Sequence, residues 1–322
     1  MKLAVLTSGG DAPGMNAAVR AVVRSGIHRG WVVYGVEEGF AGLMAGNYKP
    51  LGLRDVGGIL QLGGTMLGSA RSLEFKTVEG RKRAVSQLRQ VGIEALIVIG
   101  GNGSQAGAFT LHQEGFPVVG ISSTIDNDLA GFDITLGVDT ALNVALEAID
   151  RLKTTASSHH RAFLVEVMGR DCGYLALTAG IAGGAEVTVL PEFETTPEQV
   201  VDALHDAFSR GKSHALVVVA EGAMHNAQAL ADHCNNRHQG VGFKLRVVTL
   251  GHVQRGGAPG AFDRLLGSRL GVAAVKQIFD RNFGVIVGLK DGQVAAVPHE
   301  EAVGVAKQLP TELLEMAQVL SR

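Results

Sequence analysis

Seven short apolar runs, separated by stretches with helical periodicity, constrain the fold of this chain more than any other feature. Most of them are rich in valine and isoleucine, and continuous apolar runs are typical of strands buried on both faces of a parallel sheet. Strands that alternate with helices predict an α/β fold with wound, mostly parallel sheets flanked by helices. The runs are residues 3–6, 32–36, 95–99, 118–121, 163–167, 216–220 and 247–250.

Composition favours two domains of this class. The chain has 322 residues, which is too long for one ordinary hydrophobic core. Hydrophobic residues make up 46% and charged residues 19%, as in a globular protein. Glycine is abundant, with 44 residues, and aromatic residues account for 5%, which suits many short turns between strands and helices.

One helical stretch, residues 197–209, has a clear start and end. Thr196 is a good N-cap and Pro197 takes the first helical position, where its missing N–H does no harm. Gly211 should end the helix. We expect this helix to bury Val200, Val201, Leu204 and Phe208.

Charge and hydropathy exclude several classes of partner. The formal net charge of −2 provides no basic surface for nucleic acid. No apolar stretch approaches the length of a membrane span, and residues 3–6 are too short for the core of a signal peptide. The two cysteines, Cys172 and Cys234, are best interpreted as reduced thiols. We therefore expect a cytoplasmic protein without nucleic-acid or membrane partners.

Two glycine-rich loops, residues 8–16 and 100–104, follow predicted strands and open predicted helices. Glycine lets the backbone approach a phosphate, and a helix N-terminus presents N–H donors to an anion. Such turns also serve tight packing between strand and helix, and Asn102-Gly103 is an ordinary turn dipeptide. Each loop by itself leaves both interpretations open.

Asp126 and Asp128 follow the predicted strand at residues 118–121. In an extended segment both carboxylates would face the same way. Phosphoryl transfer needs Mg²⁺ and an acceptor for the hydroxyl proton, so one carboxylate can act as base and the other can hold the metal, directly or through water. A turn with two solvated acids is the commoner arrangement. The buried strand and the neighbouring glycine loops favour the catalytic interpretation.

Several arginines lie in glycine-bearing segments near predicted strand ends. The guanidinium group is suited to bidentate binding of phosphate. Each arginine alone is more often a surface charge, but together they suggest a phosphorylated substrate. They are Arg161, Arg170, Arg246 and Arg255.

With these motifs the chain resembles the bacterial ATP-dependent 6-phosphofructokinases over nearly all its length. The resemblance implies the two-domain phosphofructokinase fold and phosphoryl transfer from Mg-ATP to the 1-hydroxyl of fructose 6-phosphate, which yields fructose 1,6-bisphosphate in glycolysis. Residues 124–128 and 251–257 are its most specific segments. The others are residues 8–11, 14–16, 168–170, 183–186 and 220–222.

The resemblance also implies roles for individual residues. Asp126 would accept the proton of the 1-hydroxyl, Asp128 would help to bind Mg²⁺, and Thr124 would orient the sugar or the phosphoryl group, with Arg170 as a fourth catalytic residue. The implied substrate-binding residues are Thr124, Asp126, Arg161, Met168, Gly169, Arg170, Glu221, Arg246, His252 and Arg255. The implied nucleotide-binding residues are Gly10, Arg71, Ser72, Gly101, Asn102, Gly103 and Ser104.

Further implications concern assembly and regulation. Arg161 and Arg246 would reach the sugar phosphate from a neighbouring subunit, which implies the family's homotetramer. An allosteric site between subunits would bind ADP or phosphoenolpyruvate. Arg20 and Arg24 are one helical turn apart and could share an anion, although a solvated helix face explains them equally well. The implied effector residues are Arg20, Arg24, Arg54, Lys153, Glu186, Arg210 and Lys212.

The resemblance supplies domain bounds that composition does not. The nucleotide-binding domain would comprise residues 1–137 and 252–304. The sugar-phosphate-binding domain would comprise residues 138–251 and 305–322.

Asn102 is the main departure from the family pattern. The phosphate-binding loop of the family usually reads Gly-Gly-Asp-Gly-Ser, and its aspartate binds Mg²⁺. Asparagine keeps a carbonyl oxygen but lacks the charge that a hard cation prefers, so we expect a weakened metal site and reduced activity. Phe40, Ser72, Ser122 and Ser123 also depart from the pattern, and the departures concentrate on the nucleotide side.

Two alternatives remain open. The pyrophosphate-dependent branch of the family favours aspartate at position 103 and lysine at position 123, and Gly103 and Ser123 argue against it. The second alternative is a weakly active or inactive regulatory paralogue that binds sugar phosphate or effector. Asn102 supports it, whereas Asp126, Asp128 and Arg170 argue for a working enzyme.

Overall fold

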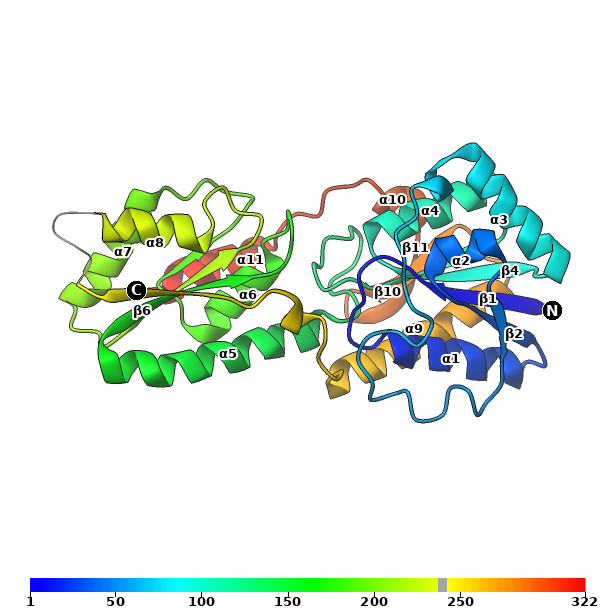
Figure 1. The fold of residues 1–322 in the computed structure, drawn as a ribbon, viewed down its shortest axis with the longest axis horizontal. Coiled ribbons are helices and arrows are strands. Elements are labelled where there is room, and N and C mark those ends of the chain that lie inside the picture. Colours follow the sequence, from blue (N-terminus) through cyan, green and yellow to red (C-terminus); the bar gives the residue numbers. More distant parts are fainter. Residues whose placement is uncertain (237–241, 322) are drawn as a thin grey trace. The chain divides into compact units, whose positions relative to one another are not determined.

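The computed structural model describes residues 1–236 and 242–321, which form two compact units (Figure 1). Unit 1 comprises Met1–Ile125, Leu129–Thr140 and Arg255–Lys307, and unit 2 comprises Asp126–Asp128, Ala141–Gln254 and Gln308–Arg322. Residues 126–128, which the prediction counted with the nucleotide-binding domain, pack with unit 2. The ligand that each unit binds stays a prediction.

Unit 1 is built on a seven-stranded sheet within the described residues, in the order β11-β10-β5-β4-β1-β2-β3. The inner strands are parallel, and only the edge strands β3 and β11 pair in the antiparallel sense. The strands are β1 (Lys2–Thr7), β2 (Val32–Val36), β3 (Tyr48–Leu51), β4 (Ala95–Gly100), β5 (Val118–Ser122), β10 (Val285–Lys290) and β11 (Gln293–Pro298).

Helices cover both faces of this sheet. In Figure 1, α2, α3 and α4 lie on one face, where Phe40, Leu88 and Leu111 contribute to the core, and α1 and α9 lie together on the other. The elements are α1 (Met15–His28), α2 (Gly39–Ala45), α3 (Val78–Val91), α4 (Asn102–Gln113), α9 (Ala261–Phe279), α10 (His299–Ala302) and the 3-10 turn η1 (Glu74–Lys76).

Unit 2 is built on a smaller sheet whose four described strands, in the order β7-β8-β6-β9, are all parallel. α7 and α8 cover one face, and α5 and α6 lie on the other (Figure 1). The strands are β6 (Arg161–Val167), β7 (Val187–Val189), β8 (Ala215–Ala220) and β9 (Lys244–Thr249). The helices are α5 (Val138–His159), which begins in unit 1, α6 (Tyr174–Gly183), α7 (Pro197–Ser209), α8 (Ala227–Asn235) and α11 (Thr311–Leu320), with the 3-10 turn η2 (Gly251–Gln254).

The predicted α/β class is confirmed, and a strand is present at every apolar run. α7 begins as predicted, because the Thr196 side chain accepts a hydrogen bond from the backbone N–H of Gln199. The expectation that Phe208 is buried in the core is wrong. Its exposed fraction is 47%, its ring packs edge-on against Phe243, and Ala207 is buried in its place. No helix in the described part of the chain is long and apolar enough to cross a membrane.

The strand order places a topological switch point at β1. The chain passes from β1 to β2 on one side and later returns to β4 on the other side. In open parallel sheets, ligands bind beyond the carboxyl ends of the strands at such a point. Residues 8–14 and 101–104 follow β1 and β4 and therefore occupy this position.

Asp263, in the first turn of α9, is fully buried and caps the N-terminus of α5. Its Oδ1 accepts a hydrogen bond from the Gly137 N–H at 2.8 Å, and its Oδ2 accepts from Thr140 N at 2.9 Å and from Thr140 Oγ1 at 2.6 Å. Burial raises the pKa of Asp263, and the hydrogen bonds oppose that rise. The carboxylate thus satisfies donors that a helix start leaves without intrahelical partners.

We expect Asp263→Asn to lower the free energy of unfolding by about 2–3 kcal/mol, because an amide presents one oxygen to these donors and adds a competing NH₂. Urea denaturation at neutral pH measures the change. Asp280→Asn is the matched control, since Asp280 pairs with Lys276 at the exposed end of α9 and should contribute less than about 0.5 kcal/mol. Equal losses in the two variants would contradict the capping role.

His299, the first residue of α10, is a second buried ionisable group in unit 1. It is fully buried, and its ring stacks on Phe109 of α4 with the centroids 5.8 Å apart. Burial lowers the pKa of His299 to about 4. The His299 side chain therefore takes up a proton near pH 6.5 in the unfolded chain, but only near pH 4 in the folded chain.

Protonation of His299 therefore lowers the free energy of unfolding as the pH falls from about 6.5 to about 4, by roughly 3 kcal/mol in total. We expect His299→Phe, which cannot take up a proton, to lose much less stability over this range than the native chain. Urea denaturation at pH 7, 6, 5 and 4 makes the comparison. Parallel pH profiles for the two proteins would show that His299 does not titrate as its burial requires.

Candidate functional site

The loops that follow β1, β4 and β5 pack closely against one another in unit 1. A Cβ atom on Gly100 would lie 2.5 Å from the Ser8 carbonyl oxygen and 2.7 Å from Ser104 Oγ. A Cβ atom on Gly101 would lie 3.0 Å from Thr124 Cβ. Packing therefore requires glycine at position 100, whereas a side chain at position 101 would need a small shift of Thr124, whether or not a phosphate binds there.

Gly103 differs from these two glycines. It is exposed, lies in the first turn of α4, and a Cβ atom added to it would meet nothing within 4 Å. α4 begins at Asn102, and its N-cap residue Gly101 provides no side-chain hydrogen bond to the first N–H groups. A helix start of this kind can bind an anion. The fold does not need glycine at position 103, which agrees with a close approach of ligand there.

Arg255 lies against the first glycine loop. A Cβ atom on Gly10 would be 2.6 Å from Arg255 Nη1, and this nitrogen donates a hydrogen bond to the Asp11 carbonyl oxygen at 3.2 Å. The residue is 7% exposed. We predicted Arg255 as a sugar-phosphate residue, and within unit 1 it brings a cation to the loop predicted for nucleotide phosphates.

Asn16 anchors the segment that carries Arg71 and Ser72. Its buried amide donates to the carbonyl oxygens of Leu62 and Gly63 at 3.1 and 3.2 Å and accepts from Met66 N at 2.7 Å. Arg71 is exposed at the end of this segment. The Ser72 hydroxyl accepts a hydrogen bond from Phe75 N, which gives it a local structural role at η1.

Phe40 is buried in the core of unit 1, where its ring stacks on Phe75 with the centroids 4.0 Å apart. The family resemblance set this position among the departures on the nucleotide side. The structure gives Phe40 a packing role in the hydrophobic core.

Gln105 is a residue that sequence reasoning missed. It is fully buried, and its Nε2 donates to the carbonyl oxygens of Val98, Gly100 and Ile121, at 3.2, 3.0 and 3.0 Å. It thereby joins the carboxyl ends of β4 and β5. One signal was available: Gly120 interrupts an apolar strand, and a Cβ atom there would lie 2.1 Å from Gln105 Oε1.

Asp126 meets Arg170 in unit 2. Asp126 Oδ2 is 3.5 Å from Arg170 Nε, and the carboxylate side chain is 4% exposed against 53% for the arginine. The segment is not extended, so the condition under which both carboxylates would face the same way is not met. Residues 125–126 form a turn and Asn127 has φ +52°, so Asp126 is buried whereas Asp128 is partly exposed.

Glu221 holds the loop after β6 through its backbone. Its Oε1 accepts hydrogen bonds from Gly169 N at 3.3 Å and from Arg170 N at 2.9 Å. Glu221 follows β8, and its own N–H donates to the Val167 carbonyl oxygen at 2.9 Å. The structure thus brings together Met168, Gly169, Arg170, Glu221 and Asp126, whereas His252 is exposed on η2.

Arg161 and Arg246 are not part of this group within one chain. Arg161 is the first residue of β6, and the loop with Arg170 follows the last. Arg246 lies on the neighbouring strand β9, in register with Phe163 near the amino end of β6. Their positions therefore differ from those of the other predicted sugar-phosphate residues.

The predicted effector residues of unit 2 are divided between two ion pairs and a backbone contact. Lys212 Nζ lies 2.8 Å from Glu186 Oε1, and Lys153 Nζ donates to the Gly183 carbonyl oxygen at 3.0 Å. Arg210 pairs with Asp206 of its own helix at 2.9 Å. In unit 1, Arg24 and Arg54 are exposed and Arg20 is half-buried.

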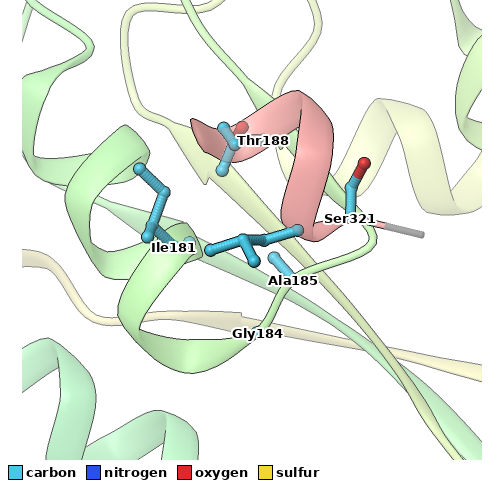
Figure 2. A pocket seen from close by; sticks show the side chains of 8 residues that line it. Ile181, Gly184, Ala185, Thr188 and Ser321 are labelled. Carbon is cyan, nitrogen blue, oxygen red and sulfur yellow. The ribbon is translucent and has the colours of Figure 1, made fainter. Parts of the chain in front are cut away.

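A small pocket lies beside α6, β7 and α11 in unit 2 (Figure 2). Its volume of about 20 Å³ suits a water molecule rather than a substrate. No titratable side chain lines it, so it offers no catalytic chemistry. The lining residues are Gly180, Ile181, Gly184, Ala185, Thr188, Ala317, Leu320 and Ser321.

The chain is similar to known proteins over nearly its whole length. The family model described as Phosphofructokinase matches residues 2–278. ATP-dependent 6-phosphofructokinase from Thermotoga neapolitana and ATP-dependent 6-phosphofructokinase 1 from Thermus thermophilus are each 50% identical over 321 residues, which is 99% of this chain and 99% of theirs. The crystal structure of Pichia pastoris phosphofructokinase in the T-state superposes with a TM-score of 0.90 at 36% identity, over 99% of this chain and 36% of that one. The chain therefore belongs to the phosphofructokinase family and has its fold.

Proposed function

We propose that this chain is an ATP-dependent 6-phosphofructokinase, which transfers the γ-phosphoryl group of Mg-ATP to the 1-hydroxyl of fructose 6-phosphate in glycolysis. The observation that carries the proposal is the pair formed by the buried carboxylate of Asp126 and the exposed guanidinium of Arg170. Two relatives with this activity in their names are 50% identical over the full length.

In the proposed reaction the Asp126 carboxylate accepts the proton of the 1-hydroxyl as that oxygen attacks the γ-phosphorus. The bond from the γ-phosphorus to the β,γ-bridging oxygen breaks, and ADP leaves. Arg170 binds the sugar phosphate, and its guanidinium group lies beside the Asp126 carboxylate that acts as the base. Arg255 and the N-terminus of α4 supply positive charge to the nucleotide phosphates, while Gly103 leaves room for them. Most of the catalysis is therefore positioning and charge stabilisation.

The residues present fit a magnesium ion held mainly by the nucleotide. The described residues contain no group of three or more His, Cys, Asp or Glu side chains that could hold a metal by themselves. Mg²⁺ commonly binds through one or two carboxylates, substrate phosphates and water. Asp128 would hold it directly or through water, with the Asn102 carbonyl oxygen as a weaker ligand, and the ion would neutralise charge on the transferred phosphoryl group.

A second subunit would complete the sugar-phosphate site. Arg161 and Arg246 lie toward the amino ends of their strands, so we assign them to the site of a neighbouring copy in a homotetramer. The effector residues would bind ADP or phosphoenolpyruvate in the same assembly, in the cytoplasm. Separate measurements of mass in solution and of effector response test these two assignments.

A coupled assay with fructose 6-phosphate and Mg-ATP tests the proposed function. We expect turnover with ATP and none with pyrophosphate, and Asp126→Asn should reduce kcat by about 10²- to 10⁴-fold because the base is lost. A chain that binds fructose 6-phosphate without turning it over would favour the regulatory paralogue. Turnover with pyrophosphate alone would favour the pyrophosphate-dependent branch.

Asn102→Asp tests the metal argument. The new carboxylate would supply the charge that the family places at this position, so we expect kcat/KM for Mg-ATP to rise about tenfold, equivalent to about 1.4 kcal/mol. The KM for fructose 6-phosphate should stay nearly constant. Steady-state kinetics over a range of Mg²⁺ concentrations measures both. Equal or lower kcat/KM in the variant rules out a metal-ligand role for this position.

A further inference from the structure

Gln254 is a fully buried residue of η2 whose side chain reaches the loop after β6. Its Oε1 accepts a hydrogen bond from Met168 N at 2.8 Å. This bond sets the orientation of the amide, because the Met168 N–H requires an acceptor. The Gln254 Nε2 then faces away from Met168, and it is buried without a hydrogen-bond partner among the described residues.

Gln254 and Glu221 together hold three consecutive backbone N–H groups. Gln254 accepts a hydrogen bond from the Met168 N–H, and Glu221 accepts hydrogen bonds from the N–H groups of Gly169 and Arg170. The two acceptors come from different segments, since Glu221 follows β8 and Gln254 follows β9. The backbone from Met168 to Arg170 is therefore fixed from two directions within unit 2.

This backbone needs such support, because its conformation is unusual. Gly169 has φ +139° and Arg170 has φ +50°, in the left-handed region that residues with a side chain rarely adopt. The segment also passes very close to Gly222, where a Cβ atom would lie 1.9 Å from the Arg170 carbonyl oxygen. The direction of the Arg170 side chain toward Asp126 depends on this conformation.

We propose that Gln254 is a positioning residue of the sugar-phosphate site, which acts through the Met168 backbone to hold Arg170 at Asp126. The proposal rests on the assignment of residues 168–170 to sugar-phosphate binding. The proposal also explains why a glutamine with an unsatisfied donor lies between His252 and Arg255. The segment that carries these two predicted binding residues uses the Gln254 oxygen to hold a second binding loop, residues 168–170.

Gln254→Met separates this role from a general effect on folding. Methionine has a similar length, so it leaves the Met168 N–H without its acceptor but also removes the buried unsatisfied Nε2 donor. The two changes oppose each other in stability. We therefore expect a melting temperature close to that of the native chain, with the Arg170 loop held by Glu221 alone.

The test is steady-state kinetics with each substrate varied in turn. We expect Gln254→Met to raise the KM for fructose 6-phosphate about tenfold and to change the KM for Mg-ATP less than about twofold. Gln254→Glu retains an oxygen for the Met168 N–H and should restore the KM for fructose 6-phosphate to within about threefold of the native value. Val253→Ala is the control, because that neighbouring side chain is 61% exposed.

The outcomes distinguish this inference from the proposed function. An inactive native chain would overturn the proposed function. An active native chain whose Gln254→Met variant keeps its KM for fructose 6-phosphate would overturn the positioning role alone. Equal increases in both KM values together with a lower melting temperature, or a Gln254→Glu variant no better than Gln254→Met, would also overturn it in favour of a structural role.

Discussion

The parallel pairing of β1 with both β2 and β4 is the constraint on which the rest of unit 1 depends. Because parallel strands end at one edge of a sheet, this pairing brings the loops after β1, β4 and β5 together. The contact is so close that Gly100 and Gly101 cannot carry a side chain without displacing Ser8, Ser104 or Thr124. Gln105 then fixes the ends of β4 and β5 with three hydrogen bonds. Close packing and hydrogen bonds within unit 1 thus hold the loop that is predicted to bind phosphate.

In unit 2, side-chain acceptors hold the corresponding loop, which follows β6. The loop after β6 has few backbone partners of its own, and Glu221 and Gln254 provide them from the segments after β8 and β9. In both units, buried or backbone-bonded side chains hold the segments that carry the predicted binding groups, Arg170 in unit 2 and the first N–H groups of α4 in unit 1. Support of ligand-contacting groups by other residues is typical of sites built on rigid elements.

Sequence periodicity predicted a strand at seven places, but it missed the inner strand β10, whose first four residues are buried. β9 is largely exposed or half-buried, although its run predicted a strand buried on both faces. Three further strands were missed because the pattern is absent. β3 and β11 are edge strands with partly exposed residues, and β7 has three residues, so none forms a long apolar run. The turn at residues 125–126 was not predicted, because the left-handed conformation of Asn127 leaves no periodic signal. Gln254 and Asp263 were missed because they act through contacts distant in sequence. Gln105 was missed because its role depends on carbonyl groups of two different strands. Asp126, Asp128 and the arginines were proposed from their residue types and positions, whereas the individual role of each residue came only from the family resemblance.

The discontinuity of unit 1 has a consequence for its synthesis on the ribosome. β10 pairs with β5 through Val285 and Val119, and the whole of Ala141–Gln254 lies between them in the chain. During translation the seven-stranded sheet therefore keeps one side of β5 open until β10 emerges, while most of unit 2 is already complete. An unpaired parallel strand is a template for wrong partners, so the nascent chain passes through a stage at which β5 is most vulnerable to aggregation.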